Sequence, residues 1–356
     1  MEGSAGAKAA VFPSDWRRYA DASTELEVYR LTDPAYSSAL PPYYNRAVSR
    51  SRRFLLYSCD RAGSPQAFYM DLSSGETRQL TQSEDLDGAS LALLPNNLSF
   101  CYFAGRRLYL TNLTTLTERA VYTMPDESER GAGLSVTPDG THALFIERQG
   151  ELRRVRMAPL GRGEARTVVE ASFEISDPIM RPQHQQVLYR QGDAALWLVD
   201  SAGKQNRHLK LAPGGVGPAN WAPDGSTVLY LNFPADRAQL NAVREYAPDT
   251  DTEKLVAKTS QYVHFGFNHD TSVFVGASRN AASPAVLIML RVNGRELTIC
   301  DHRASRAESV APIFSPDAQR LYFQSDHGGK PAIYSVHIER LVEKIEEPGS
   351  SGAVRE

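Results

Sequence analysis

The residues best suited to chemistry recur at similar positions in several repeated units of the chain. They are polar or charged side chains that a ligand could contact: Tyr44, Asn45, Arg46, Asp177, Asn220, His264, Arg306 and Glu308. A guanidinium group matches the planar geometry of a carboxylate, so Arg46 and Arg306 indicate an anionic ligand. Imidazole serves both proton transfer and metal binding, which makes His264 a candidate for either role.

Each of these residues also has a purely structural interpretation. A lone histidine in a channel is more often a hydrogen-bonded structural residue than a catalyst, and Asp177, which precedes Pro178, is also typical of a turn. Arg46 and Glu308 can equally be structural or solvated side chains that line a water-filled channel. The sequence has no G-x-S-x-G, H-E-x-x-H or P-loop motif, so we assign no catalytic residue from motifs.

Composition excludes several classes of protein. The 356 residues are 42% hydrophobic and 23% charged, as in ordinary globular proteins, and the net charge of −3 gives no basic footprint for nucleic acid or an anionic membrane. No apolar run is long enough to span a bilayer, and the first residues do not form a signal peptide, so we expect a cytoplasmic protein. Cys59, Cys101 and Cys300 are too far apart for a disulfide or zinc pattern and are expected to be buried free thiols.

A repeated unit determines the expected fold. Each copy has a short apolar strand, a Pro-Asp-Gly-type turn, an alternating strand, a second turn and a third strand, as in LSVTPDGTHALFIERQGELRRVRM from Leu134. The turn anchors lie 41 to 47 residues apart: Arg50, Pro95, Pro138, Pro182, Pro223, His269 and Pro316. Seven such units predict an all-β, seven-bladed β-propeller.

The ends of the chain indicate how the ring closes. The last unit stops after its third strand, and a near-copy of the missing strand, EVYRLT at Glu27–Thr32, precedes the first unit. We therefore expect this N-terminal strand to pair with the last blade and cover its open edge. The predicted organisation is an N-terminal tail over residues 1–23, the propeller over 24–341 and a helical or disordered C-terminal tail over 342–356.

The propeller predicts where the candidate residues lie. The inner strands of a propeller line a central channel, and ligands bind at its mouth, so residues that open each first strand are expected there. Of the eight histidines, only His264 has this position; the others, including His302, are expected in turns or on solvated strand faces.

Several segments resemble the oligogalacturonate lyase family. They include RFLLYSCDRAGSPQAFYMDLSSGETRQLT, NWAPDGSTVLYL, VHFGFNHDTSVFVGAS and SPDAQRLYFQSDHGGKPAIYSV, and the similarity runs from about Leu31 to Val336. The repeats are also similar, more generally, to TolB-type propeller units. The resemblance implies a cytoplasmic seven-bladed propeller that cleaves short pectin oligosaccharides by β-elimination, with a histidine base, an arginine, and a manganese ion held by histidines and a glutamine.

Most of the positions that this resemblance implies are substituted. Pro218 occupies the position of the base and Ala195 that of the arginine, while the glutamine and two histidines of the metal site are replaced by Arg306, Ser309 and Ala311. His264 alone keeps a metal-ligand position. Proline cannot accept a proton, and one imidazole cannot hold manganese against water. No cofactor is expected, and Mn²⁺ only if the family site persists.

Two hypotheses about function follow. The first is a ligand-binding or scaffolding propeller that has lost metal-assisted elimination. The alternative is an active lyase on oligogalacturonate or a related uronate-containing oligosaccharide, with a rearranged site around His264. The expected partner is an anionic, uronate-like carbohydrate or a protein, with no nucleic acid and no membrane.

Overall fold

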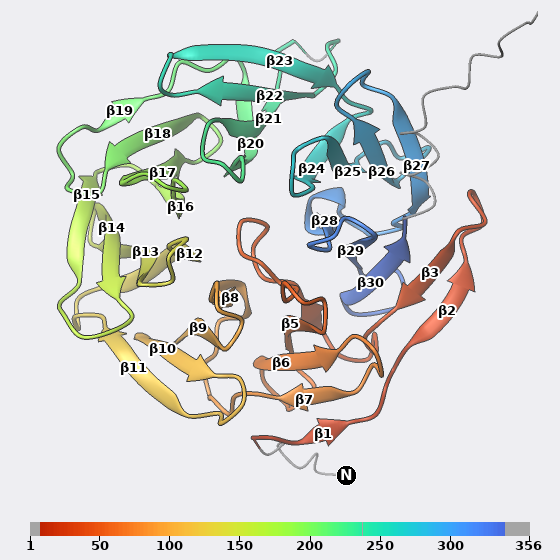
Figure 1. Ribbon diagram of the computed structural model, residues 1–356, viewed down its shortest axis with the longest axis horizontal. Helices are drawn as coiled ribbons and strands as arrows, with labels where there is room; N and C mark the ends of the chain where they lie inside the picture. The colour runs from red at the N-terminus through yellow and green to blue at the C-terminus, as the bar shows by residue number, and fades with distance from the viewer. Residues whose placement is uncertain (1–7, 237, 339–356) are drawn as a thin grey trace, which may run out of the picture.

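The computed structural model describes residues 8–236 and 238–338, which form seven antiparallel sheets around a central channel (Figure 1). Each sheet is one blade, and its strands follow one another from the channel to the rim. The all-β seven-bladed propeller predicted from the repeat is therefore confirmed. Within the described residues, no helix is long and apolar enough to cross a membrane.

The first three blades contain the following strands. Blade 1 has β4 (Ser38–Ala39), β5 (Phe54–Cys59), β6 (Gln66–Asp71), β7 (Thr77–Gln79) and β1 (Val11–Phe12). Blade 2 has the 3-10 helix η1 (Gly88–Ser90), then β8 (Ala92–Leu93), β9 (Ser99–Ala104), β10 (Arg107–Asn112) and β11 (Glu118–Thr123). Blade 3 has β12 (Glu129–Val136), β13 (His142–Gln149), β14 (Leu152–Pro159) and β15 (Arg166–Ala171).

The remaining four blades continue round the ring. Blade 4 has β16 (Ser176–Met180), β17 (Gln186–Gln191), β18 (Ala195–Asp200) and β19 (Arg207–His208). Blade 5 has β20 (Gly215–Trp221), β21 (Val228–Phe233), β22 (Ala242–Ala247) and β23 (Thr252–Lys258). Blade 6 has β24 (Tyr262–Phe267), β25 (Val273–Ser278), β26 (Ala285–Leu290) and β27 (Glu296–Asp301). Blade 7 has the 3-10 helix η2 (Ala307–Ser309), then β28 (Ile313–Phe314), β29 (Arg320–Ser325), β30 (Ala332–His337), β3 (Glu27–Arg30) and β2 (Arg17–Ala20).

The turn anchors connect the first strand of each blade to the second, as the repeat predicted. In blades 3 and 5 the residue two positions after the anchor proline is Gly140 or Gly225, with φ of 72° and 71°. Glycine adopts this left-handed conformation without steric cost. At Gly225 a side chain would also meet the Pro182 carbonyl oxygen of the neighbouring blade at 2.4 Å. The turn glycine therefore also permits close packing between blades.

The hydrophobic core lies between neighbouring blades. Side chains from the middle strands of adjacent sheets interdigitate, and Phe103 of blade 2 meets Phe145 of blade 3 edge-on with ring centroids 5.2 Å apart. The three cysteines are buried and free, as expected. Because each sheet covers the face of the next, no blade has a complete core of its own.

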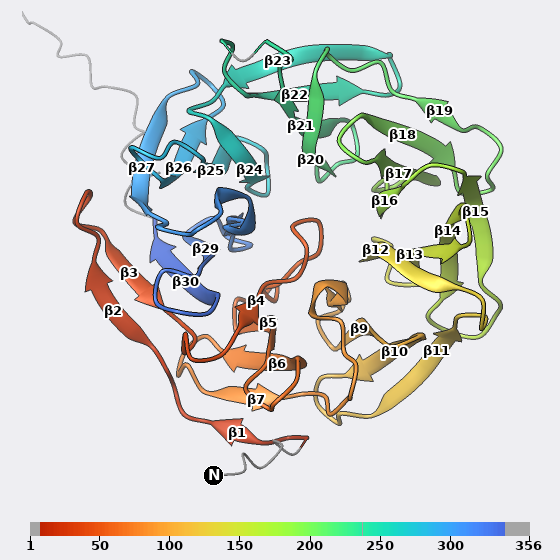
Figure 2. The same cartoon turned by 180° about the vertical axis from the view of Figure 1, so that it is seen from behind.

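The N-terminal strand closes the ring on the last blade. Strand β3 lies beside β30 (Figure 2) and pairs with it antiparallel, with Val28 opposite Val336 and Arg30 opposite Tyr334. The Val28 side chain is fully buried. This confirms the predicted closure. Two further strands lie within the segment predicted as a tail: β2 pairs with the outer edge of β3, and β1 pairs with β7 of blade 1. The predicted C-terminal tail, 342–356, lies outside the described residues.

Candidate functional site

In every blade the regular pairing of the inner strand is interrupted, and the interruptions lie at a similar height along the channel. In blades 3 to 6 the pairing register shifts between Arg130 and Leu134, Ser176 and Ile179, Val216 and Ala219, and Tyr262 and His264. Blades 2 and 7 have η1 and η2 at this level. Such bulges leave backbone out of the sheet and redirect side chains, which is why they are frequent beside functional sites.

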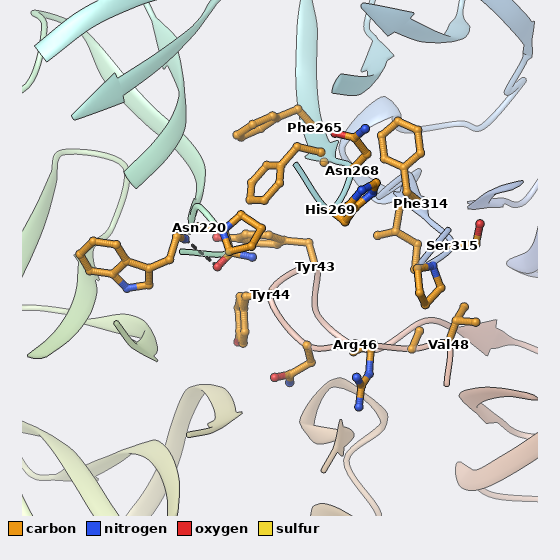
Figure 3. Close-up of a pocket in the computed structure, with 18 of the residues that line it drawn as sticks. Tyr43, Tyr44, Arg46, Val48, Asn220, Phe265, Asn268, His269, Phe314 and Ser315 are labelled. Carbon is orange, nitrogen blue, oxygen red and sulfur yellow. Dashed lines mark hydrogen bonds between the residues drawn. The ribbon is translucent and has the colours of Figure 1, made fainter. Parts of the chain in front are cut away.

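Blade 1 has the largest interruption. Ala39 pairs with Ser58, and pairing resumes only at Val48, opposite Leu55. Between them residues 41–46 form a loop that projects into the channel, which we call the crossbar (Figures 1 and 3). The candidate residues Tyr44, Asn45 and Arg46 belong to the crossbar and not to a regular first strand, which corrects their predicted place.

The crossbar is hydrogen-bonded to blades across the channel. The Tyr43 hydroxyl donates to the Ala219 carbonyl oxygen and accepts from the Ala219 amide, both at 3.1 Å. The Asn45 amide donates to the carbonyl oxygens of Leu91 and Leu134 at 3.1 and 2.7 Å. These bonds fix the loop to blades 2, 3 and 5 and explain why Asn45 is buried.

A cavity of about 550 Å³ lies on one side of the crossbar. It brings together two predicted residues of blades 4 and 6, Asp177 and His264, with Glu308 of η2. Its wall also includes Pro218, so the positions where the family resemblance places the base and one metal ligand do converge. We call this the His264 cavity. An adjoining cavity of about 430 Å³ is lined by His264, Ala311 and Gln324 among others.

His264 is buried and electrically neutral in this cavity. Its side chain is nearly inaccessible, and its Nδ1 atom has no hydrogen-bond partner among the described residues. Burial and the nearby positive charge of Arg190 lower the pKa of His264 to about 4. The imidazole packs edge-on against the ring of Tyr43, with centroids 5.3 Å apart. At neutral pH the imidazole is therefore unprotonated, and its low pKa makes it a weak proton acceptor.

Arg190 is a site residue that the sequence analysis missed. Its guanidinium donates to the Val216 carbonyl oxygen at 2.8 Å and to Asp193 Oδ1 at 3.0 Å, and its Nε lies 3.8 Å from Asp177 Oδ2. Burial raises the pKa of Asp177, while the charge of Arg190 opposes this rise. Its position in the sequence offered a signal, because Arg190 directly follows the apolar strand residues VLY. An arginine in a buried strand is rare unless its charge is paired.

The candidate residues lie on both sides of the crossbar, and Tyr44 lines one cavity with Asp177 and another with Arg46. Asp177, His264 and Glu308 line the His264 cavity, whereas Arg46 and Asn220 line another cavity on the far side. Arg306 is exposed and is not among the residues that line either cavity. Arg279, which was not predicted, lies on the rim of the His264 cavity.

One other histidine differs from its predicted setting. His302 was expected to be solvated, but it is buried, and its ring forms hydrogen bonds with the Ser278 carbonyl oxygen at 2.9 Å and the Ala304 amide at 3.1 Å. The packing of blade 6 against blade 7 covers it, which the local sequence does not reveal.

The described residues around His264 do not fit a manganese ion. No group of three or more His, Cys, Asp or Glu side chains in the described part of the chain could hold a metal. The neighbouring positive charge of Arg190 would also repel a cation at Nδ1. We therefore derive no step through a metal.

The seven sheets and the cavity between their inner strands define a class of protein: a seven-bladed propeller with a pocket at its axis. Comparison with known proteins narrows the class. The profile of the oligogalacturonate lyase family matches residues 6–151. An oligogalacturonide lyase of Pectobacterium atrosepticum is 25% identical, over 93% of this chain and 98% of its own.

Solved structures agree with this match. An oligogalacturonate lyase in complex with manganese has a TM-score of 0.88 and 25% identity, covering 93% of this chain and 98% of its own. TolB of Acinetobacter baumannii is similar in fold, with a TM-score of 0.50, 16% identity, and coverage of 73% of this chain and 62% of its own. The resemblance to the oligogalacturonate lyase family is thereby confirmed over nearly the whole chain.

Proposed function

We propose that this oligogalacturonate-lyase-like propeller is a cytoplasmic protein that binds short uronate-containing oligosaccharides in the His264 cavity and no longer performs metal-assisted β-elimination. The observation that carries the proposal is the composition of this cavity. A proline, Pro218, stands where the resemblance implies a base, and a neutral imidazole lies beside a guanidinium, without a set of metal ligands. The relatives named above are lyases of oligogalacturonate, which supports an anionic oligosaccharide as the ligand.

The charges of the cavity support binding of a carboxylate. Arg279 is exposed, and among the described residues its side chain has no acidic partner and only a long hydrogen bond, 3.4 Å, to Gln261 Oε1. Arg190 uses most of its donors on backbone oxygens and Asp193, which leaves it as a fixed positive charge. Asp177, whose pKa is raised by burial, is more readily protonated than an ordinary aspartate and would then donate a hydrogen bond to a carboxylate.

Binding and turnover measured together test the proposal. Di- and trigalacturonate are titrated by calorimetry, once with a chelator and once with Mn²⁺, while the ultraviolet absorbance of the unsaturated product is followed in parallel. We expect binding that does not depend on the metal, no product, and weaker binding by Arg279→Met. Stoichiometric bound manganese with product formation would overturn the loss of elimination.

The alternative, an active lyase with a rearranged site, is favoured by one observation. His264 is unprotonated at neutral pH and lines one cavity with Arg190, so it could accept a proton α to a carboxylate that the guanidinium neutralises, but with a pKa of about 4 only as a weak base. Product formed in the presence of chelator, and abolished by His264→Gln, would establish this alternative. Absence of product with and without metal would exclude it for these substrates.

A further inference from the structure

A second cavity, on the other side of the crossbar, is chemically unlike the His264 cavity. It has a volume of about 610 Å³, within the range of small-molecule sites, and it lies where the first strands end and the anchor turns begin (Figure 3). The crossbar residues Tyr43 and Tyr44 form its floor, and residues of blades 5, 6 and 7 form its walls. We call it the turn-side cavity.

The charged groups of this cavity are all cationic. Arg46 and Arg50 line it, and none of the described residues that line it is an aspartate or a glutamate. Arg46 makes one hydrogen bond, from Nη2 to the Leu94 carbonyl oxygen at 3.0 Å, while its buried Nε has no partner among the described residues. Arg50 has no ion pair in the described part of the chain.

The positive charges of Arg46 and Arg50 repel one another. Burial, and then the positive charge of Arg50, lower the pKa of Arg46 to about 10. A half-buried guanidinium beside another cation costs free energy until an anion neutralises it, because desolvated charges in proteins are normally paired. None of the described residues that line the cavity supplies such an anion.

The opposite wall of the turn-side cavity is aromatic. Phe265, Phe267 and Phe314 lie on it, and Figure 3 shows Phe265 and Phe314 near His269 and Asn268, across from Tyr44 and Arg46. The Asn268 amide is already bonded to Ser272 and Val273. The Asn220 side-chain oxygen accepts from the Trp221 amide at 2.9 Å, and no described residue accepts from its nitrogen. The Asn220 nitrogen, the His269 imidazole, two cations and apolar rings therefore surround the space.

We propose that the turn-side cavity binds a small organic anion, a carboxylate or phosphate carried on an apolar ring. The anionic oxygens contact Arg46 and Arg50, and the ring packs against Phe267 and Phe314. This site does not depend on the function proposed for the His264 cavity, because the two cavities lie on opposite sides of the crossbar.

Calorimetric titration with four probes tests the proposal. Benzoate and phenyl phosphate carry the two alternative anionic groups on one ring; benzyl alcohol is the neutral control, and inorganic phosphate lacks the ring. We expect at least one ring-bearing anion to bind about tenfold or more tightly than both controls, as charge-assisted hydrogen bonds predict. Which of the two binds better identifies the anionic group. Equal binding of benzyl alcohol, or of inorganic phosphate alone, would overturn the proposal.

Variants locate the site. Arg46→Met keeps the aliphatic stem, and Arg50→Ala alters an exposed residue, so the second variant tests the proposal even if the first fails to fold. Each is expected to weaken the ring-bearing anion about tenfold. Arg279→Met, on the rim of the His264 cavity, is the matched control and should leave this affinity unchanged. Weakening by Arg279→Met, with none by Arg50→Ala, would place the anion in the other cavity and refute the inference.

Discussion

His264 is the residue whose protonation state most directly tests the description of the site. We expect an NMR titration to show its imidazole neutral down to about pH 4, since burial and the charge of Arg190 both lower its pKa. Removing that charge in Arg190→Met should raise the pKa of His264. A pKa at or above that of an exposed histidine would contradict the geometry around Nδ1.

The same residue makes stability depend on pH. In the unfolded chain His264 has an ordinary pKa of about 6.5, and in the folded chain about 4, so between these values the unfolded state binds the additional proton. The free energy of unfolding should therefore fall as pH is lowered from about 6.5 to about 4, with a contribution from His264 of up to about 3 kcal/mol. Urea denaturation of the native chain and of His264→Gln across this range measures it. Equal pH slopes in the two proteins would refute this contribution.

At the scale of elements, a single tyrosine hydroxyl attaches the crossbar to blade 5. Tyr43→Phe removes both hydrogen bonds to Ala219 and leaves a backbone donor and acceptor without this partner. We expect a loss of about 1–3 kcal/mol in the free energy of unfolding, measured by urea denaturation. Tyr29→Phe, which removes an exposed bond to Glu27, is the control and should cost much less. Equal effects would indicate that the crossbar is not held from blade 5.

A buried arginine joins blades 4 and 5. Arg181 is 1% exposed; it donates from Nε to the Gly225 carbonyl oxygen at 2.7 Å and from Nη1 to Asp249 Oδ1 at 2.8 Å, and its guanidinium lies 5.3 Å from the Trp221 ring centroid. Arg181→Met should destabilise the protein by about 2–4 kcal/mol, because it leaves the Gly225 oxygen unsatisfied.

The acidic partner of this arginine provides the comparison. Asp249 is largely exposed and loses little itself, but Asp249→Asn leaves the buried Arg181 guanidinium without its counter-charge and should cost about 1–3 kcal/mol. Thermal and urea unfolding of both single variants and the double variant measure the difference. A larger loss from Asp249→Asn than from Arg181→Met would contradict the burial argument.

At the scale of the whole molecule, ring closure determines whether the chain folds as one unit. Deleting residues 1–32 removes β1, β2 and β3, exposes the edge of β30 and takes Val28 from the core. We expect this truncated chain to aggregate or to lose cooperative unfolding, as seen by size exclusion and circular dichroism. Deleting only residues 1–8 keeps all three strands and should have little effect. Cooperative unfolding of both truncated chains would show that closure is dispensable.

The sequence predicts the repetitive part of this molecule well and its exceptions poorly. The turn anchors and the closing strand at Glu27 follow from the repeated unit, which every blade copies. The crossbar, by contrast, depends on Tyr43 meeting Ala219, 176 residues away, and nothing in the sequence around either residue reveals that contact. The same holds for His302, which is covered by packing between blades.

In the candidate site, too, the residues set by the repeat were predicted and those set by non-local contacts were not. His264, Asp177 and Glu308 were found because first strands of a propeller face its axis. Arg190 was missed because it lies on a second strand, and its turn toward the axis depends on the bulges of the neighbouring blades. Arg46 was grouped with His264 because position along a repeat does not tell on which side of a loop a side chain lies.

The crossbar also limits what can move through the axis of the disc. Tyr43 and Asn45 are bonded to blades on the far side of the channel, so the crossbar spans the axis and should obstruct a long polymer that threads from one face to the other. If the His264 cavity binds uronate chains as proposed, their terminal sugar units should enter and leave it by the same opening. The amount of polysaccharide bound should therefore follow the number of chain ends in solution and not the total mass of sugar.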